Sequence, residues 1–216
     1  MRQLSLRRSL VGLSLLGVVL MASTARPQSQ ERIGAVTAVE GQATVLRQGR
    51  FAPEPLAVQT PVFQEDIIET AVASKVTITL TDATVISLGE RSRLELKQFL
   101  HEARQQTYTA RLRILSGVFR TIVRKLIPQS AFEVTTTTAV AAIRGTDLMG
   151  EVAADSTAIV VLDGTVMVSN ARPGIGGPAT LTQGMGTTVK GDEPPSTPTR
   201  WSESRIEALR KATAIP

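Results

Sequence analysis

Apolar and polar residues alternate along much of the central part of the chain. Residues 76–80 (V-T-I-T-L) alternate strictly, and shorter alternating runs follow at 94–96 and 110–114. This period of two is typical of strands that bury one face. The continuous apolar run at 158–162 is typical of a strand buried on both faces. Since no comparable helical pattern interrupts residues 33–190, we predict a single all-β domain over this range.

One turn sequence recurs between these β-rich runs. Asp82-Ala83-Thr84-Val85 matches Asp163-Gly164-Thr165-Val166, and residues 40–45 form a looser copy. An acid followed by a small residue favours a tight turn, because positive φ is accessible there. The recurrence indicates either stacked coils or the ordinary reuse of turns in an all-β protein. We predict a solenoid- or roll-like stack of short strands.

The C-terminal part differs in composition from the β-rich region. Residues 191–199 are polar and Pro-rich, which is typical of a linker. Residues 200–214 predict a short C-terminal helix, with Ile206 and Leu209 on one face and Glu207 four positions before Lys211. Because isolated helices of this length are marginal in water, the helix either docks on the sheet or forms a mobile tail.

The N-terminal residues have the pattern of a secretory signal peptide. Three arginines precede an uncharged apolar run at 10–22, and Ser23-Thr24-Ala25 supplies small residues for cleavage. We predict a signal peptide over 1–25 and a flexible leader over 26–32. The apolar run is too short to span a bilayer comfortably, although an uncleaved anchor is the alternative. The mature chain is therefore expected in the periplasm or secreted, without a stable membrane span.

Composition narrows the chemistry and the partners. The formal net charge of +5 includes three arginines from residues 1–25, so the mature chain carries +2. This small excess does not favour a nucleic-acid partner. The chain has no cysteine, which excludes disulfides, thiolate metal sites and thiol nucleophiles. With aromatic residues at only 3%, we expect a core of Val, Ile, Leu and Ala.

The sequence offers no recognisable catalytic or metal-binding set. His101 is the single histidine, and it lies in a polar stretch between two strand candidates, so we interpret it as a solvated loop residue. Glu65, Asp66 and Glu69 lie close together but lack the spacing of a known calcium loop. We therefore predict a protein that is not an enzyme, with no catalytic residue, no metal site and no cofactor.

Basic residues gather on two neighbouring strand candidates. Alternate positions on a strand share a face, so a common basic surface is conceivable here. Its predicted members are Arg111, Arg113, Arg120, Arg124 and Lys125. Such a surface suits lipid head groups, acidic glycans or an acidic protein. The alternative, which we favour, is a solvated sheet face with acids opposite the arginines.

An uncharged β-rich run at 134–143 ends abruptly in Arg144-Gly145-Thr146. A guanidinium beside a buried strand needs partners, since removing it from water is costly. Gly145 permits a backbone conformation that other residues avoid. Two interpretations are open for Arg144, Gly145 and Thr146. They form either a structural corner, in which Arg144 binds the carbonyls of adjacent coils, or a site for an anion or a partner. We favour the structural corner.

This segment resembles the FecR family of bacterial envelope proteins, whose pattern is V-x-T-P-x-A-V-A-A-V-R-G-T-x-F. Val134, Thr136, residues 139–142 and residues 144–146 match, while Ile143, Thr137 and Leu148 replace the Val, Pro and Phe. Residues 64–70 resemble the family's G-D-x-I-x-T. The resemblance extends roughly over residues 33–189.

The resemblance implies an exported, solenoid-like β domain that binds another envelope component. Family members with known roles resemble periplasmic sensors joined through a membrane helix to a cytoplasmic anti-sigma domain. No such domain precedes the apolar run here, so we expect a stand-alone FecR domain. The predicted function is a non-enzymatic protein-interaction or sensory module, whose partner is an envelope protein. The alternative is a module that binds envelope glycans or anionic surfaces through the basic strand face.

Overall fold

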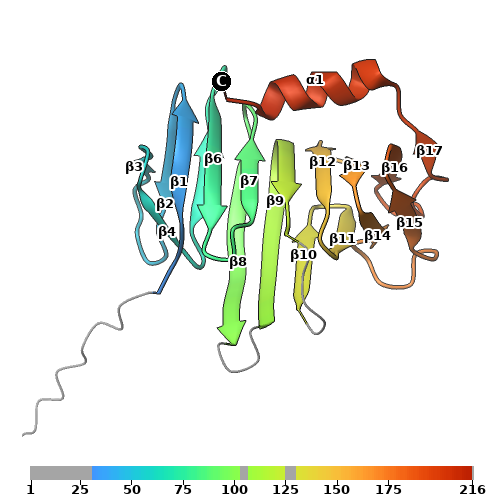
Figure 1. Ribbon diagram of the computed structural model, residues 1–216, viewed down its shortest axis with the longest axis horizontal. Coiled ribbons are helices and arrows are strands. Elements are labelled where there is room, and N and C mark those ends of the chain that lie inside the picture. The colour runs from blue at the N-terminus through green and yellow to red at the C-terminus, as the bar shows by residue number, and fades with distance from the viewer. Residues whose placement is uncertain (1–30, 103–106, 125–129, 216) are drawn as a thin grey trace, which may run out of the picture.

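The computed structural model describes residues 31–102, 107–124 and 130–215, which are mainly β-strands followed by one helix (Figure 1). The predicted all-β fold with a C-terminal helix is confirmed. The elements are β1 (Arg32–Glu40), β2 (Ala43–Leu46), β3 (Glu54–Pro55), β4 (Pro61–Phe63), β5 (Ile67–Thr70), β6 (Lys75–Leu80), β7 (Val85–Leu88), β8 (Arg93–Glu102), β9 (Thr107–Ile122), β10 (Ala131–Thr135), β11 (Ala139–Ile143), β12 (Asp147–Val152), β13 (Ser156–Asp163), β14 (Thr165–Asn170), β15 (Ala179–Thr182), β16 (Met185–Lys190), β17 (Thr199–Arg200) and α1 (Glu203–Thr213).

Within the described residues, hydrogen bonds connect the strands into one continuous sheet that folds over itself into two layers. Layer A contains, in spatial order, β4, β1, β6, β7, the second part of β9 (117–122), β12, β13, β16 and β17. Layer B contains β3, β2, β5, β8, the first part of β9 (107–116), β10, β11, β14 and β15. Neighbouring strands are antiparallel except β9 and β10, which are parallel. The fold is thus roll-like, with β9 shared by both layers.

The passage of β9 from layer B to layer A occurs at Gly117. Its φ of +90° lies in the region that favours glycine. An added Cβ would lie 2.2 Å from the Ser92 Oγ and 2.5 Å from the Ser92 Cα. The Ser92 hydroxyl accepts from the Val118 N–H and donates to the Val118 carbonyl, both at 3.1 Å. The corner therefore needs both the backbone freedom and the absent side chain of Gly117.

The corners that follow β1, β5 and β7, where the chain passes from one layer to the other, stack at this end, whereas the chain passes from β4 to β5 at the opposite strand ends. The Thr70 hydroxyl donates to the Gly89 carbonyl (2.6 Å) and accepts from the Ser92 N–H (2.9 Å). One corner earlier, Gly41 (φ +73°) faces Ser74 in the same way that Gly117 faces Ser92. After β9 the crossovers lie at the opposite strand ends, because Asp147 at the start of β12 pairs with Ile122.

The recurring turn sequence serves two different connections. Residues 82–85 form the hairpin between β6 and β7 in layer A, where the Thr84 N–H and hydroxyl both bind the Asp82 carboxylate. Residues 163–166 instead carry the chain from β13 in layer A to β14 in layer B. Ala83 and Gly164 both have positive φ. The repeat therefore reflects shared turn chemistry and not a structural period.

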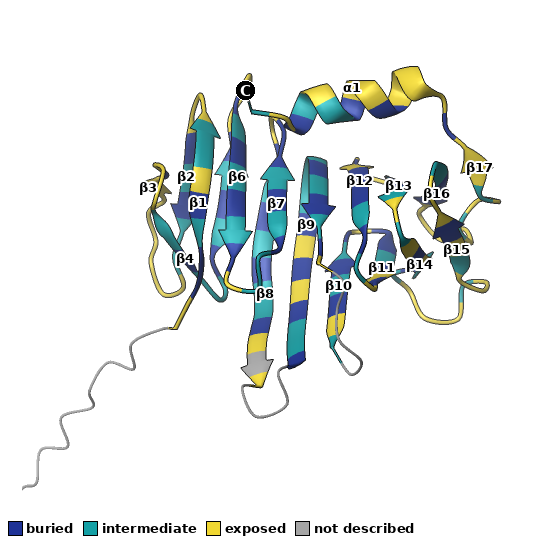
Figure 2. Ribbon diagram, in the orientation of Figure 1, coloured by how far each residue is buried: buried dark blue, intermediate teal, exposed yellow. Residues whose placement is uncertain are grey.

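The core between the layers consists of aliphatic side chains with few aromatic ones, as predicted. Strands alternate between buried and outward positions, which is visible as banding in Figure 2. Three of the buried polar residues form hydrogen bonds with one another through their hydroxyl groups: Thr136, Thr138 and Thr157. The Thr157 hydroxyl lies 2.7 Å from that of Thr136 and 2.8 Å from that of Thr138, which also donates to the Val189 carbonyl. This network joins the β10–β11 turn to layer A.

Helix α1 docks on the outer face of layer A. Trp201, Ile206 and Leu209 pack with Met149 and Val160 in a second apolar cluster. Gly186 allows the approach, since an added Cβ would lie 2.4 Å from the Trp201 ring. The helix begins at a Ser202 cap and ends near layer A, where the Lys75 ammonium donates to the Ala214 carbonyl. Of the two open alternatives, the structure thus shows the docked helix.

The element limits differ slightly from the predicted ranges. β1 begins at Arg32, inside the predicted leader, and α1 is shorter than the predicted helix over 200–214. The predicted linker over 191–199 is anchored by hydrogen bonds, including those from Thr187 to Ser196 and from Asn170 to Gly191. The predicted signal peptide (1–25) lies outside the described residues. Among the helices that are described, none has the length and apolar character of a membrane span.

We predict that Gly117→Ala lowers the free energy of unfolding by at least about 2 kcal/mol, since strain and overlap with Ser92 add together. Gly49→Ala is the matched control, because Gly49 also has positive φ (+73°) but nothing lies within 4 Å of its added Cβ. The control should cost about 1 kcal/mol. Urea denaturation measures both values, and equal losses would contradict the proposed close contact at Gly117.

Candidate functional site

The predicted motif forms the corner between β11 in layer B and β12 in layer A. Gly145 has a φ of +66°, in the left-handed region. Thr146 is only 2% exposed, and its hydroxyl donates to the Thr165 carbonyl at 3.1 Å. The Thr146 carbonyl accepts from the Val123 N–H at 2.9 Å. Gly145 and Thr146 therefore hold three neighbouring chain segments together at this end of the molecule.

A second corner stacks directly on this one. Gly164 has a φ of +89°, and an added Cβ there would lie 2.7 Å from the Gly145 carbonyl oxygen and 3.0 Å from the Thr146 Oγ1. A larger residue at position 164 would force the two corners apart. The Gly of the D-G-T-V turn is thus required by its closeness to the R-G-T corner.

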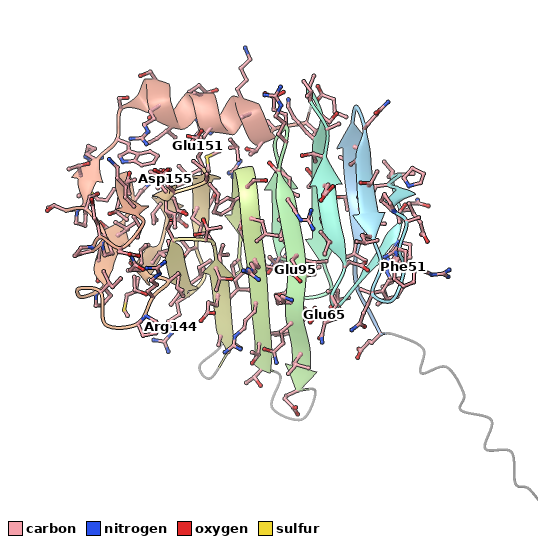
Figure 3. All side chains as sticks on the ribbon, turned by 180° about the vertical axis from the view of Figure 1, so that it is seen from behind. Phe51, Glu65, Glu95, Arg144, Glu151 and Asp155 are labelled. Atoms are coloured by element: carbon pink, nitrogen blue, oxygen red, sulfur yellow. The ribbon has the colours of Figure 1, made fainter. Side chains whose placement is uncertain are left out.

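Arg144 does not bind the corner carbonyls, so that part of our prediction is wrong. Its side chain is exposed and, within the described chain, has no hydrogen bond or ion pair. Ile143 points into the core, so strand alternation turns Arg144 outward. The carbonyls of Thr146 and Thr165 are already satisfied by Val123 and the Thr146 hydroxyl. Figure 3 shows Arg144 on the side of the molecule away from α1.

Two adjoining hollows meet at Arg144. The first, of about 350 Å³, is mainly apolar and lies over the outward faces of β10, β11 and β14. The second, of about 560 Å³, is more polar and lies over the two stacked corners. The first is lined by Ser130, Ala131, Phe132, Glu133, Ala142, Ile143, Arg144, Thr165 and Met167. We call this first hollow the apolar groove.

The acids of the second hollow are not equivalent. Asp147 receives two hydrogen bonds from the Arg120 guanidinium, at 3.0 Å and 2.6 Å. Hydrogen bonding to Asp147 raises the pKa of Arg120, and the two side chains form an ion pair. Asp163 is exposed and lines the second hollow only. Arg144 is the basic residue that both hollows share.

The predicted basic surface does not exist as one surface. Gly117 turns β9 between the layers, so Arg111 and Arg113 lie on the outer face of layer B, whereas Arg120 lies on that of layer A. Arg124 is exposed just after β9, and Lys125 lies outside the described residues.

Acids accompany the arginines of layer B. Arg111 lies 3.7 Å from Glu133, and Arg113 lies 3.9 Å from Glu95. The same face carries further pairs between Arg93 and Glu69 and between Lys97 and Glu95; Figure 3 labels Glu65 and Glu95. This is the favoured alternative, a solvated face with acids opposite.

Comparison with known families agrees with the motif. Residues 66–167 match the family model described as FecR protein. The chain contains a FecR domain. The match begins at Asp66 and includes the R-G-T corner, and it is narrower than the predicted resemblance over residues 33–189. No curated protein matches the chain.

Solved structures share the fold of this FecR domain. Two crystal structures of a "putative anti-sigma factor from Parabacteroides distasonis ATCC 8503" match with TM-scores of 0.55 and 0.52, at 15% and 16% identity. Both matches cover 67% of this chain, but only 63% and 64% of the matched chains. At such low identity the likeness shows the fold alone.

The FecR match begins at a buried acid, Asp66, which is 0% exposed. One carboxylate oxygen accepts from the Phe63 N–H (2.8 Å) and from the Arg47 guanidinium. The other oxygen has no partner among the described residues. Burial raises the pKa of Asp66, while the Phe63 N–H and Arg47 act in the opposite direction. Asp66 is therefore a structural residue at the start of β5.

No catalytic or metal-binding arrangement emerges in the described residues. Glu65, Asp66 and Glu69 do not converge, and the described chain has no group of three or more metal-ligating side chains placed around one point. We predicted that His101 lies in a loop between strands, but it lies on β8, where its backbone pairs with Tyr108. The arrangement at Arg144 suits binding, since it offers a donor with no partner in the described part of the chain beside an apolar surface.

Sequence reasoning missed Ala142 and Met167 as members of the groove. Met167 is 50% exposed, between the buried Val166 and Val168. The alternation of β14 could have identified this outward methionine. That Ala142 lies beside it depends on the pairing of β11 with β14, which the sequence does not reveal.

We predict that Thr146→Val costs about 1 to 2 kcal/mol of unfolding free energy, because it removes a buried donor from the Thr165 carbonyl. Arg144→Ala should change this free energy by less than about 0.5 kcal/mol, since the side chain is exposed and unpaired. Urea denaturation of both variants tests whether Thr146, and not Arg144, stabilises the corner. A large loss with Arg144→Ala would restore the architectural role for its guanidinium.

Asp66 should make stability depend on pH in a defined direction. Since its folded-state pKa is raised above the ordinary value of 3.8, its favourable contribution is complete below that value and is lost as pH rises through the raised pKa. Relative to Asp66→Asn, the wild type should therefore become progressively less stable above about pH 4. Urea denaturation at several pH values measures this difference, and a constant difference would contradict the raised pKa.

Proposed function

We propose that this FecR domain is a non-enzymatic protein-interaction or sensory module, exported to the bacterial cell envelope and located in the periplasm or secreted. The observation that carries the proposal is Arg144. Its guanidinium is exposed at the end of the apolar groove and has no partner among the described residues. An exposed cation beside apolar surface is a common feature of protein-binding sites, where Arg is enriched.

Export is supported by the N-terminal sequence. Residues 1–25 combine a basic start, an uncharged apolar run and small residues before the predicted cleavage point. The chain has no cysteine, and the described domain is held together by an aliphatic core. Its stability therefore does not depend on the redox state of the compartment.

A protein partner is favoured over a glycan or an anionic surface. The two solved structures that share this fold are named "putative anti-sigma factor", which describes a role directed at another protein. The glycan alternative relied on a basic strand face. Three of its predicted members, Arg111, Arg113 and Arg120, lie beside acids and are divided between two faces of the molecule. This pairing leaves little positive field for a polyanion.

We predict that a photo-cross-linking amino acid at position 167 of the tagged full chain captures a discrete protein in the envelope fraction of a bacterial host. Position 72 is the matched control, since Val72 is 58% exposed, close to the 50% of Met167. Val72 lies in the corner between β5 and β6, at the end of the molecule opposite the R-G-T corner. The adduct should form at 167 and not at 72. Protease should destroy it, and glycan hydrolases should leave it unchanged.

The same experiment tests export. N-terminal sequencing of the recovered chain should begin at Arg26, and Leu15→Asp, which interrupts the apolar run, should retain the chain in the cytoplasm. A wild-type chain that stays in the cytoplasm would contradict the proposed location. An adduct sensitive only to glycan hydrolases would favour the glycan alternative.

A further inference from the structure

The floor of the apolar groove is made by a row of three outward residues. The register places Ala142 between Glu133 on β10 and Met167 on β14. Because the methyl group of Ala142 is much shorter than its two neighbours, a hollow remains over β11. The volume of about 350 Å³ is at the low end of ligand pockets. It therefore suits one or two side chains and not a folded domain.

The described residues around the groove carry an excess of positive charge. Glu133 lies 3.7 Å from Arg111, so the acid of the groove already has a basic neighbour. Arg144 has no such partner in the described chain, and Asp163 lines the second hollow only. One uncompensated positive charge therefore remains at the end of the groove, and it complements a single negative charge.

The surface around the groove restricts where a partner can place its apolar groups. Toward β8 and β5, the outer face of layer B is covered by alternating ion pairs, such as Arg93 with Glu69. Toward β14 and β15, the outward residues are uncharged, with Met167 the one large apolar side chain exposed there. Methionine adapts its shape readily to different apolar partners.

We propose that the apolar groove binds a short extended segment of a partner protein, in which an aliphatic side chain is closely followed by a carboxylate. The aliphatic side chain occupies the hollow over Ala142 and packs against Met167. The carboxylate accepts hydrogen bonds from the Arg144 guanidinium, whose planar fork matches a carboxylate. This inference rests on the proposed function and adds the chemistry of the segment that is recognised.

The test uses three acetylated and amidated hexapeptides, in which Leu is followed by Asp at one, two or three positions and the remaining residues are Gly and Ser. Each has a matched Asn peptide. Titration of the purified exported chain, followed by amide ¹H–¹⁵N NMR, detects millimolar binding. At least one Asp peptide should shift the signals of Ala142, Arg144 and Met167 and bind about tenfold more tightly than its Asn counterpart, as expected for a hydrogen bond to a charged group.

Three variants identify the site. Arg144→Gln should reduce the Asp peptide to the affinity of the Asn peptide, and Ala142→Leu, which fills the hollow from the exposed face, should weaken both peptides. Arg124→Gln is the control, because Arg124 is exposed nearby but does not line the groove. The NMR spectrum of each variant verifies that the fold is retained.

Equal affinity of all Asp and Asn peptides, or binding that survives Ala142→Leu, would overturn the inference. So would hexanoate binding at Ala142 and Arg144 when no peptide binds, since the occupant would then be a lipid. If the peptides fail but the adduct at position 167 forms, the interaction module stands and only its recognition chemistry is wrong. If the peptides bind but no adduct forms in the envelope, the proposed function fails instead.

Discussion

The close contact between Gly117 and Ser92 fixes how the two layers are joined. β9 belongs to both layers, and its positive φ at Gly117 redirects the strand while the Ser92 hydroxyl satisfies the backbone of Val118. Ser92 leaves no space for a side chain at position 117, so the bend requires glycine there. The bend divides the partners of β9. β8 pairs with the part before Gly117, and β7 and β12 pair with the part after it.

This bend also decides where the later corners lie. After β9 the crossovers stack at the opposite strand ends, where Val123, Thr146 and Thr165 satisfy one another's backbone groups. The carbonyls of Thr146 and Thr165 therefore already have donors. The guanidinium of Arg144 binds neither of them, and its side chain faces solvent beside the apolar groove.

The two outer faces of the molecule differ for physical reasons. Residues of α1 and Trp201 cover the apolar outward residues Met149 and Val160 of layer A, which would otherwise be exposed. Figures 1 and 2 show α1 running across the ends of the strands. In the described chain no helix covers layer B, and its outer face is made compatible with water by paired charges over β5, β8 and β9. Those pairs compensate each other and leave little net field. The groove interrupts this face with small and apolar residues.

The sequence by itself determined the local structure. Alternation in segments such as residues 76–80 identified strands, the absence of cysteine and scarcity of aromatics identified an aliphatic core, and the pattern at 132–148 identified the FecR domain. These features follow from the period of a strand and from side-chain chemistry, which are properties of neighbouring residues. Ile206 and Leu209 likewise indicated the helix, although not whether it docks.

Only the tertiary structure decided which segments meet. The bend at Gly117 placed Arg111 and Arg120 on opposite faces, although they belong to the same strand. Strand pairing brought Ala142 beside Met167, and the carbonyl of Thr165 took its donor from Thr146 and not from Arg144. Pairing across long sequence separations depends on the whole set of strands and corners, and no short segment encodes it. The chemistry of each residue was therefore readable from the chain, while its neighbours and its exposure were set by the fold.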